Sequence, residues 1–359
     1  MNKNYLRETE DKEETPAESA LASEEENHTL LPLINSAFPP GRCLETIRAI
    51  RDEHERGVAM GEYYYFSGQP EEAAKAMEPY LTSTDIVLGL SACLVYAYAN
   101  LATDKIHLAR HALSEMEKTF ADVNKDEKSQ PELRAMSAFV STTAAVLLHL
   151  PLKNESAFSA ENRMLLPEGL RFFSCYVQAH YAYLQGDYGR SIGIVETSLS
   201  FMPKLYPIPA IYLRLVAVMD YMSLKNTEKA KEQMLKAWEL ARPDGLIEAF
   251  GEHHGLLGGV LEATLKKDCP KEFRRIISIT YSFSAGWRKV HNLDTGHDVA
   301  DNLTTTEFAI AMLAARGWTN QEIGDHMGIR PNTVKWYISI ILDKLDAEGR
   351  DDLAKYMLR

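Results

Sequence analysis

Apolar residues recur at helical spacing along most of the chain, and most clearly near its C-terminal end. Within residues 330–345 the apolar positions stand at i, i+4, i+7 and i+11, namely Val334, Ile338, Ile341 and Leu345. This spacing predicts an amphipathic helix with those four side chains on one buried stripe. The opposite stripe is free to contact a partner, and it contains Asn332, Lys335, Trp336, Ser339 and Asp343.

Two shorter helices are predicted just before this segment, because each carries its own start signal. Thr304 with Glu307 and Thr319 with Glu322 are Thr-x-x-Glu pairs, in which the hydroxyl and the carboxylate each satisfy a free backbone amide. Residues that favour helix ends or starts follow at the expected places: Gly317, Gly328 and Pro331. The sequence therefore predicts three consecutive helices joined by short turns.

These residues resemble the LuxR-type helix-turn-helix domain without a gap over roughly 55 residues. The matching positions are Leu303, Thr304, Glu307, Ala315, Gly317, Asn320, Glu322, Ile323, Ile329, Thr333, Val334, Lys335, Ile341, Lys344, Leu345 and Arg350. The resemblance implies a four-helix DNA-binding domain over residues 303–359, with the third helix in the major groove. It also implies that a final helix over 350–358 joins two such domains as a homodimer.

The resemblance and the helix geometry together predict the DNA contacts. The residues expected to reach base edges are Lys335, Trp336 and Ser339, with Asn332 nearby. The residues expected to contact phosphates are Thr319, Asn320, Arg330, Thr333 and Lys344. Two positions depart from the family pattern: Arg330 replaces the usual serine cap of the recognition helix, and Tyr337 replaces a frequent histidine. We therefore expect an unusual sequence preference.

Residues 29–283 are rich in Ala, Leu, Tyr and Met at helical spacing and predict an all-α region. Four segments share a helix, a short polar turn and a second helix that begins with a small residue: 60–73, 96–109, 178–191 and 217–230. A wider gap between the second and third segments leaves room for one degenerate unit around residues 131–166. The pattern resembles the tetratricopeptide repeat, which implies a solenoid with a concave binding surface. An irregular all-helical domain is the alternative.

Tyrosines are dense near the expected inner helices of this region. A rigid aromatic ring with a polar tip suits a peptide or small-molecule surface, so four residues are candidates for such a site: Tyr64, Tyr98, Tyr181 and Tyr183. Core packing is the competing interpretation. Glu252, His253 and His254 do not predict a metal site, because adjacent histidines on a helix point about 100° apart.

The remaining segments are polar. Residues 1–28 are acidic and aperiodic, and they predict a disordered tail that acts as a solubilising extension or competes with DNA for the basic helix. Residues 284–302 contain glycines and polar residues that break the helical pattern, so they predict a linker between the two domains. Trp287 is expected to hold this linker against the repeat region.

The charge distribution limits the expected DNA affinity. The chain has a formal net charge of −12, of which −6 lies in residues 1–30 and −2 in residues 301–359. Within 330–344, however, three bases stand against one acid. Because affinity for DNA comes largely from phosphate neutralisation, we expect modest binding that depends on dimerisation and salt.

Several function classes lack support. The chain has no phosphate-binding loop, dinucleotide turn, nucleophile elbow or His-Glu-x-x-His pair, so no enzyme and no cofactor is predicted. Its 4 cysteines have no zinc or disulfide spacing. No apolar run has the length of a membrane span or the pattern of a secretory signal, which favours the cytoplasm.

The sequence therefore predicts a regulator that binds promoter DNA and contacts RNA polymerase, governed by a helical repeat domain that senses a ligand or a partner protein. The alternative is a repeat scaffold that binds proteins such as RNA polymerase and has little DNA affinity. The weak positive charge of the C-terminal domain keeps this alternative open.

Overall fold

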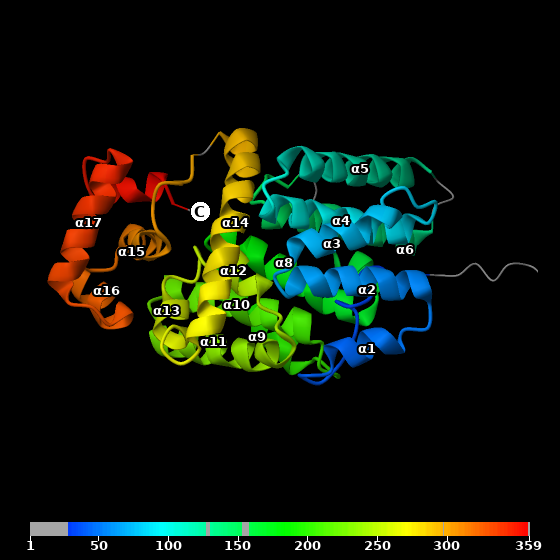
Figure 1. The fold of residues 1–359 in the computed structure, drawn as a ribbon, viewed down its shortest axis with the longest axis horizontal. Helices are drawn as coiled ribbons and strands as arrows, with labels where there is room; N and C mark the ends of the chain where they lie inside the picture. The colour runs from blue at the N-terminus through cyan, green and yellow to red at the C-terminus, as the bar shows by residue number, and fades with distance from the viewer. Residues whose placement is uncertain (1–27, 127–129, 153–157, 297, 358–359) are drawn as a thin grey trace, which may run out of the picture.

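The computed structural model describes residues 28–126, 130–152, 158–296 and 298–357. Within these ranges every regular element is a helix, and no strand occurs (Figure 1). The all-α prediction is confirmed. The predicted disordered tail lies outside the described residues, except for His28. None of the described helices is both long and apolar enough to cross a membrane.

The repeat-like region is built from helical hairpins. Each of the four segments identified in the sequence forms two helices that pack on each other: α2 (Glu53–Phe66) with α3 (Pro70–Met77), α4 (Ile86–Ala102) with α5 (Ile106–Lys125), α8 (Glu168–Leu184) with α9 (Tyr188–Ser200), and α10 (Pro207–Ser223) with α11 (Thr227–Ala241). A short helix, α1 (Cys43–Ala49), precedes them.

The turns of these hairpins share one backbone conformation. In each turn one residue has a positive φ, and the next amide donates a hydrogen bond to the carbonyl five residues earlier. This is the cap that ends helices in the left-handed conformation. A fifth turn of the same kind follows α6 (Pro131–Leu147). The positive-φ residues are Gly68, Asp104, His149, Gly186 and Lys225.

The fifth turn lies where the sequence leaves room for a degenerate unit. Among the residues described after α6, the next α-helix is the short α7 (Ala160–Met164). The region therefore contains five repeat-like units. Its relation to the tetratricopeptide repeat remains a prediction.

Small residues stand where the two helices of a hairpin meet, as the sequence predicts. A Cβ atom at Gly61 would lie 2.5 Å from the Met77 Cε atom and 3.3 Å from the Ala76 Cβ atom, so α2 and α3 pack closely at this glycine. At the start of the second helices the small residues are fully buried, namely Ala73, Ala109, Ser191 and Ala230.

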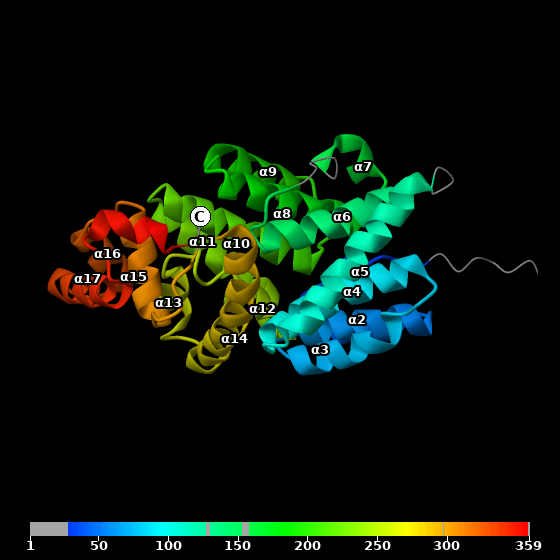
Figure 2. The same cartoon turned by 90° about the horizontal axis from the view of Figure 1, so that it is seen from above.

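The long helix α14 (Pro270–Thr295) stands between the hairpins and the C-terminal helices (Figures 1 and 2). Between α11 and α14 the chain forms α12 (Glu248–Glu252) and α13 (Val260–Leu265). Short 3₁₀ helices complete the region at Glu78–Tyr80 and Arg242–Asp244.

The predicted linker 284–302 is wrong in its first part, because α14 continues to Thr295. The glycine that suggested a break, Gly286, instead permits close packing, since a Cβ atom there would lie 2.0 Å from the Leu101 carbonyl oxygen. Trp287 does hold this segment against the hairpins. Its Nε1–H donates a hydrogen bond of 2.9 Å to the Leu147 carbonyl.

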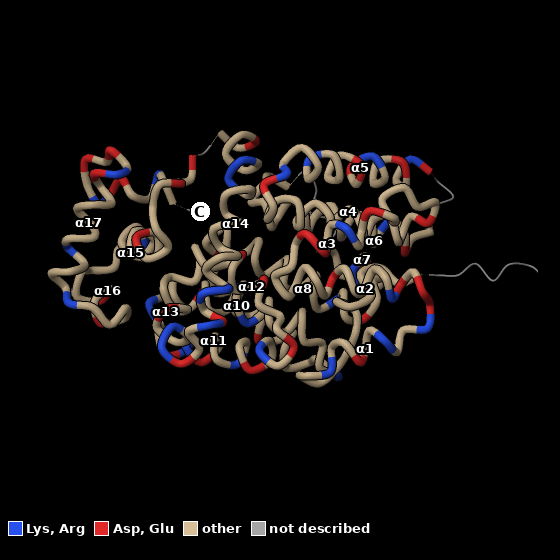
Figure 3. The backbone as a smooth tube through the Cα atoms, viewed as in Figure 1, with Lys and Arg blue, Asp and Glu red and all other residues tan. Residues whose placement is uncertain are grey.

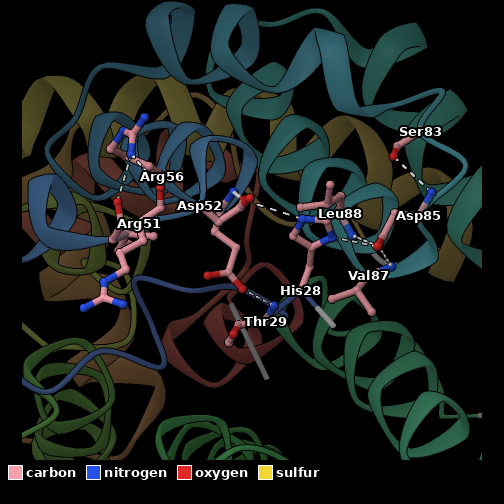
Figure 4. A network of polar contacts seen from close by, with 11 residues as sticks. His28, Thr29, Arg51, Asp52, Arg56, Ser83, Asp85, Val87 and Leu88 are labelled. Atoms are coloured by element: carbon pink, nitrogen blue, oxygen red, sulfur yellow. Dashed lines mark hydrogen bonds and ion pairs between the residues drawn. The ribbon is translucent and has the colours of Figure 1, made fainter. Parts of the chain in front are cut away.

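A polar network ties the first described residue to two helix starts (Figure 4). His28 Nδ1 lies 2.8 Å from the Asp85 carboxylate, and its Nε2 lies 3.5 Å from Asp52. These two aspartates are the N-caps of α2 and α4. Burial opposes the charge of His28, but the hydrogen bond to Asp85 and the nearby carboxylates raise its pKa above the ordinary value. The network therefore fastens both helix starts to the segment before α1.

Candidate nucleic-acid interface

The C-terminal domain contains α15 (Thr305–Ala315), α16 (Asn320–Met327), α17 (Pro331–Leu345) and the 3₁₀ helix η4 (Arg350–Lys355). Thr304 and Thr319 form the two predicted capping boxes, each closed by the glutamate three residues on. Gly317 and Gly328 have φ of +75° and +67°, which end α15 and α16 as predicted. The prediction of a fourth helix over 350–358 is wrong in type and length, because residues 350–355 form a 3₁₀ helix. Residues 358–359 lie outside the described residues.

The predicted apolar stripe of α17 packs into the core of this domain. Its four apolar residues are buried, namely Val334, Ile338, Ile341 and Leu345. Gly324 also matters, although the sequence alone gives it no special role. A Cβ atom there would lie 2.7 Å from the Ile329 carbonyl oxygen, so only glycine lets α16 approach the turn that starts α17.

The opposite face of α17 is exposed and lies at the outer edge of the molecule (Figure 1). Trp336 is 57% exposed, and its ring lies 4.9 Å from that of Tyr337. Arg330 is exposed and forms no side-chain cap, which agrees with the loss of the usual serine. Lys and Arg positions are sparse along this helix (Figure 3). The predicted base-contacting residues are all exposed here: Asn332, Lys335, Trp336 and Ser339.

Three of the five predicted phosphate contacts already have partners inside the domain. The Thr319 hydroxyl caps α16, the Asn320 Oδ1 atom accepts a hydrogen bond of 2.6 Å from Arg350, and the Lys344 ammonium lies 2.7 Å from Glu307.

The five predicted phosphate contacts also differ in whether their side chains are already paired. Burial opposes ionisation of the Glu307 carboxyl, but the Lys344 ammonium and the cap at Thr304 hold its pKa below the ordinary value. The Lys344 charge is therefore balanced locally. Arg330 and Thr333 make no side-chain hydrogen bond with the described part of the chain.

The helix-turn-helix elements pack against the repeat-like region. Arg316 Nη2 donates hydrogen bonds of 2.7 Å to the Tyr183 hydroxyl and 3.0 Å to the Leu256 carbonyl. His326 Nε2 lies 2.9 Å from the Gly258 carbonyl. No local sequence pattern marks Arg316 or His326, because their partners are far away along the chain.

Lys225 adds a contact at the start of α16. Its ammonium lies 3.1 Å from the Gly317 carbonyl and 3.2 Å from the Glu322 carboxylate. Lys225 occupies the positive-φ position of the last hairpin turn, so this turn faces the helix-turn-helix domain.

The four candidate tyrosines do not form one surface. Tyr98 is buried, and its hydroxyl donates to the Ala144 carbonyl at 3.1 Å. Tyr183 is also buried and accepts the Arg316 hydrogen bond. Tyr64 and Tyr181 are half-buried, and the Tyr181 ring packs against Phe158. Each ring therefore packs in a different place.

Metal binding finds no support in the described residues. They contain no group of three or more His, Cys, Asp and Glu side chains that could hold a metal ion.

Comparison with known proteins agrees with the C-terminal geometry. Residues 301–357 match the family of bacterial regulatory proteins, luxR family. Together with the capped helices and the buried stripe, this match shows that the C-terminal domain is a LuxR-type helix-turn-helix domain.

Two curated proteins are similar over the same part. The transcriptional regulatory protein LiaR of Bacillus subtilis is 44% identical over 59 residues, which is 16% of this chain and 28% of LiaR. The probable transcriptional regulatory protein SgaR of Hyphomicrobium methylovorum is 39% identical over 54 residues, covering 15% and 26% of the two chains. The chain thus spans little more than a quarter of each relative. No solved structure matches it significantly.

Proposed function

We propose that this protein is a transcriptional regulator that binds promoter DNA through the exposed face of α17. The observation that carries the proposal is the LuxR-type domain itself, in which one face of the third helix is buried and the other is open. The two relatives are described as transcriptional regulatory proteins, which supports the same role.

In this proposal Lys335 and Ser339 donate hydrogen bonds to base edges, and Trp336 packs on a thymine methyl group. An apolar contact of that kind distinguishes A·T from G·C pairs in the major groove. Asn332 reads a base at the start of the helix. Arg330 and Thr333 contact phosphates, because neither side chain has a hydrogen-bond partner within the described part of the chain.

Two copies of the chain are proposed to bind together. The low net charge of the C-terminal domain gives one copy few phosphate contacts, and a second copy doubles them. Half-sites about one helical turn of DNA apart are then expected. The helical hairpins act as the sensor domain, and RNA polymerase is the proposed partner at the promoter.

The test is selection of binding sites from a randomised double-stranded DNA pool with the full-length protein, followed by affinity measurements. Lys335→Ala is expected to cost about 1–3 kcal/mol on the selected site and to relax the preference at one base position. Lys236→Ala is the matched control, because Lys236 is an exposed lysine on α11 that pairs with Glu232 in the hairpin region. An unchanged affinity and base preference for Lys335→Ala would reject this reading face.

The second candidate is a protein-binding scaffold with little DNA affinity, which the charge of −2 over residues 301–359 favours. The same experiment separates the two functions. A scaffold enriches no sequence from the pool, even at low salt where phosphate contacts are strongest.

A further inference from the structure

A cavity of ≈ 90 Å³ lies at the junction of the hairpins, α14 and the C-terminal domain. One water molecule needs about 10–15 Å³ of such space, so the cavity is large enough for a small organic molecule. Its walls come from α4, α8, α12 and α14 on one side, and from residues 299–305 and α15 on the other. It therefore borders both the sensor domain and the DNA-binding domain.

Apolar and aromatic side chains make up most of the wall. The principal ones are Leu256, Phe283, Trp287, Leu303 and Phe308. Such a lining with a few placed polar groups is typical of small-molecule sites. The polar groups then decide which molecule fits.

His180 presents an unpaired nitrogen to this cavity. Its side chain is almost fully buried, and Nε2 has no hydrogen-bond partner in the described structure. A buried polar atom without a partner is costly, so a ligand that forms a hydrogen bond with His180 Nε2 gains from relieving that cost.

A relay of three residues determines the proton on His180. His253 Nδ1 must donate to the Ala249 carbonyl at 2.8 Å, because a carbonyl only accepts. Burial lowers the pKa of His253 to about 4, so its Nε2 is an acceptor for the Tyr176 hydroxyl at 3.1 Å.

The Tyr176 oxygen then accepts from His180 Nδ1 at 3.3 Å. Burial also lowers the pKa of His180 well below its ordinary value, so the ring is neutral. Its Nε2 atom therefore carries a lone pair and no hydrogen, so it can form a hydrogen bond only with a donor.

Arg288 lines the cavity from α14 and needs a hydrogen-bond acceptor, whereas His180 needs a donor. Its half-buried guanidinium forms no hydrogen bond or ion pair with a described residue, although Asp301 is near enough to favour its charge. Burial lowers the pKa of Arg288, yet guanidinium remains charged in proteins. An arginine in this state fits a carboxylate, which accepts two parallel hydrogen bonds from it.

His149 also lines the cavity, and its ring packs against His180 and Trp287. Its ring centre lies 5.4 Å from that of His180 and 5.0 Å from that of Trp287, the neighbour of Arg288. His180 and Arg288 both line the cavity. His149 is also the positive-φ residue of the turn after α6, with a φ of 52°.

We propose that this junction cavity is the effector site, and that it binds a small aromatic carboxylate carrying a hydroxyl group. The hydroxyl donates to His180 Nε2, the carboxylate binds Arg288, and the ring packs among Phe283, Trp287 and Phe308. The regulatory part of this inference rests on the proposed function. A molecule in the cavity touches both domains, so its binding favours the docked arrangement in which α15 closes the wall.

The test uses 4-hydroxyphenylacetate as the probe, with isothermal titration calorimetry on the full-length protein and no DNA. Saturable binding with a dissociation constant below about 1 mM is expected. Phenylacetate lacks the hydroxyl donor and 4-hydroxyphenylacetamide lacks the charge, so each is expected to bind at least about tenfold more weakly. This comparison uses only the wild-type protein and decides the question even if a variant misfolds.

Two variants assign the contacts. Arg288→Gln is expected to weaken binding of the probe at least about tenfold, whereas Arg274→Gln is the matched control, because Arg274 is exposed on the same helix. His180→Phe is expected to remove the preference for the probe over phenylacetate. Circular dichroism checks that each variant folds.

The outcomes separate this inference from the proposed function. Absence of saturable binding, equal binding of all three compounds, or an unchanged affinity of Arg288→Gln would overturn the site, whatever the protein does with DNA. If the probe binds but leaves the affinity for a selected DNA site unchanged, the regulatory role is overturned. If no DNA site is selected at all while the probe binds, the site stands and the proposed function fails.

Discussion

Replacing Arg316 with alanine tests how the helix-turn-helix domain is held on the hairpins. The Arg316 guanidinium donates to the Tyr183 hydroxyl at 2.7 Å and to the Leu256 carbonyl at 3.0 Å, so two contacts between the domains are lost together. A hydrogen bond from a charged donor contributes about 1.5–3 kcal/mol. Arg316 Nη1 is buried without a partner, which offsets part of this gain.

We therefore expect Arg316→Ala to weaken docking by about 3 kcal/mol. Since 1.4 kcal/mol corresponds to a factor of ten, the open arrangement becomes about 100-fold more populated. Amides in α13 and α16 that are protected only by docking should exchange with solvent faster by a similar factor. Hydrogen exchange followed by mass spectrometry measures this change on the full-length protein.

Lys225→Ala is the control for charge at the same interface. Lys225 and Glu322 are both 41% exposed, and an exposed ion pair contributes about 0.2–1 kcal/mol. Its removal should increase exchange only a few-fold. If Arg316→Ala leaves exchange unchanged, or if the two variants have equal effects, apolar contacts such as that of Met327 with Gly259 hold the domains together instead.

Three further predictions concern stability. Gly286→Val should destabilise the protein by several kcal/mol, because even its Cβ atom would overlap the Leu101 carbonyl. Chemical denaturation compares it with Gly193→Val, a change inside α9 where an added Cβ atom has no neighbour within 4 Å. Thr319→Ala should cost about 1 kcal/mol through the lost cap of α16, measurable as faster exchange of its first amides. Burial raises the pKa of Asp220 to about 8, so folding favours the protonated form, and this contribution to stability is lost as the pH rises from about 4 to 8. Asp220→Asn should therefore flatten the fall of the melting temperature over that range, and an unchanged slope would contradict the assignment.

Local signals explain why the helix boundaries of the C-terminal domain were predictable. A Thr-x-x-Glu capping box involves residues three positions apart, and a buried stripe such as Val334 to Leu345 repeats within one helix. The hairpin turns at 68, 104, 186 and 225 are equally local. Their identity as tetratricopeptide repeats is not, because it depends on how successive hairpins stack.

A glycine also gave a wrong prediction where its reason was a distant tertiary contact. Gly286 and the polar residues after Ser284 indicate a linker when only neighbours are considered. In the fold, Gly286 is small because the Leu101 carbonyl of another helix lies against it, and the real end of α14 is Gly296, whose φ is +69°. A residue selected for a tertiary contact therefore resembles a helix breaker in the sequence.

The sequence by itself determined the helical content, four of the hairpin turns and the LuxR-type domain, because these depend on residues within a few positions of each other. Only the tertiary structure decided the domain interface at Arg316 and the junction cavity with His180 and Arg288. Those features bring together residues more than 100 positions apart. Their contacts leave no periodic trace in the chain, and the tautomer of His180 follows only from a hydrogen-bond relay through Tyr176 and His253.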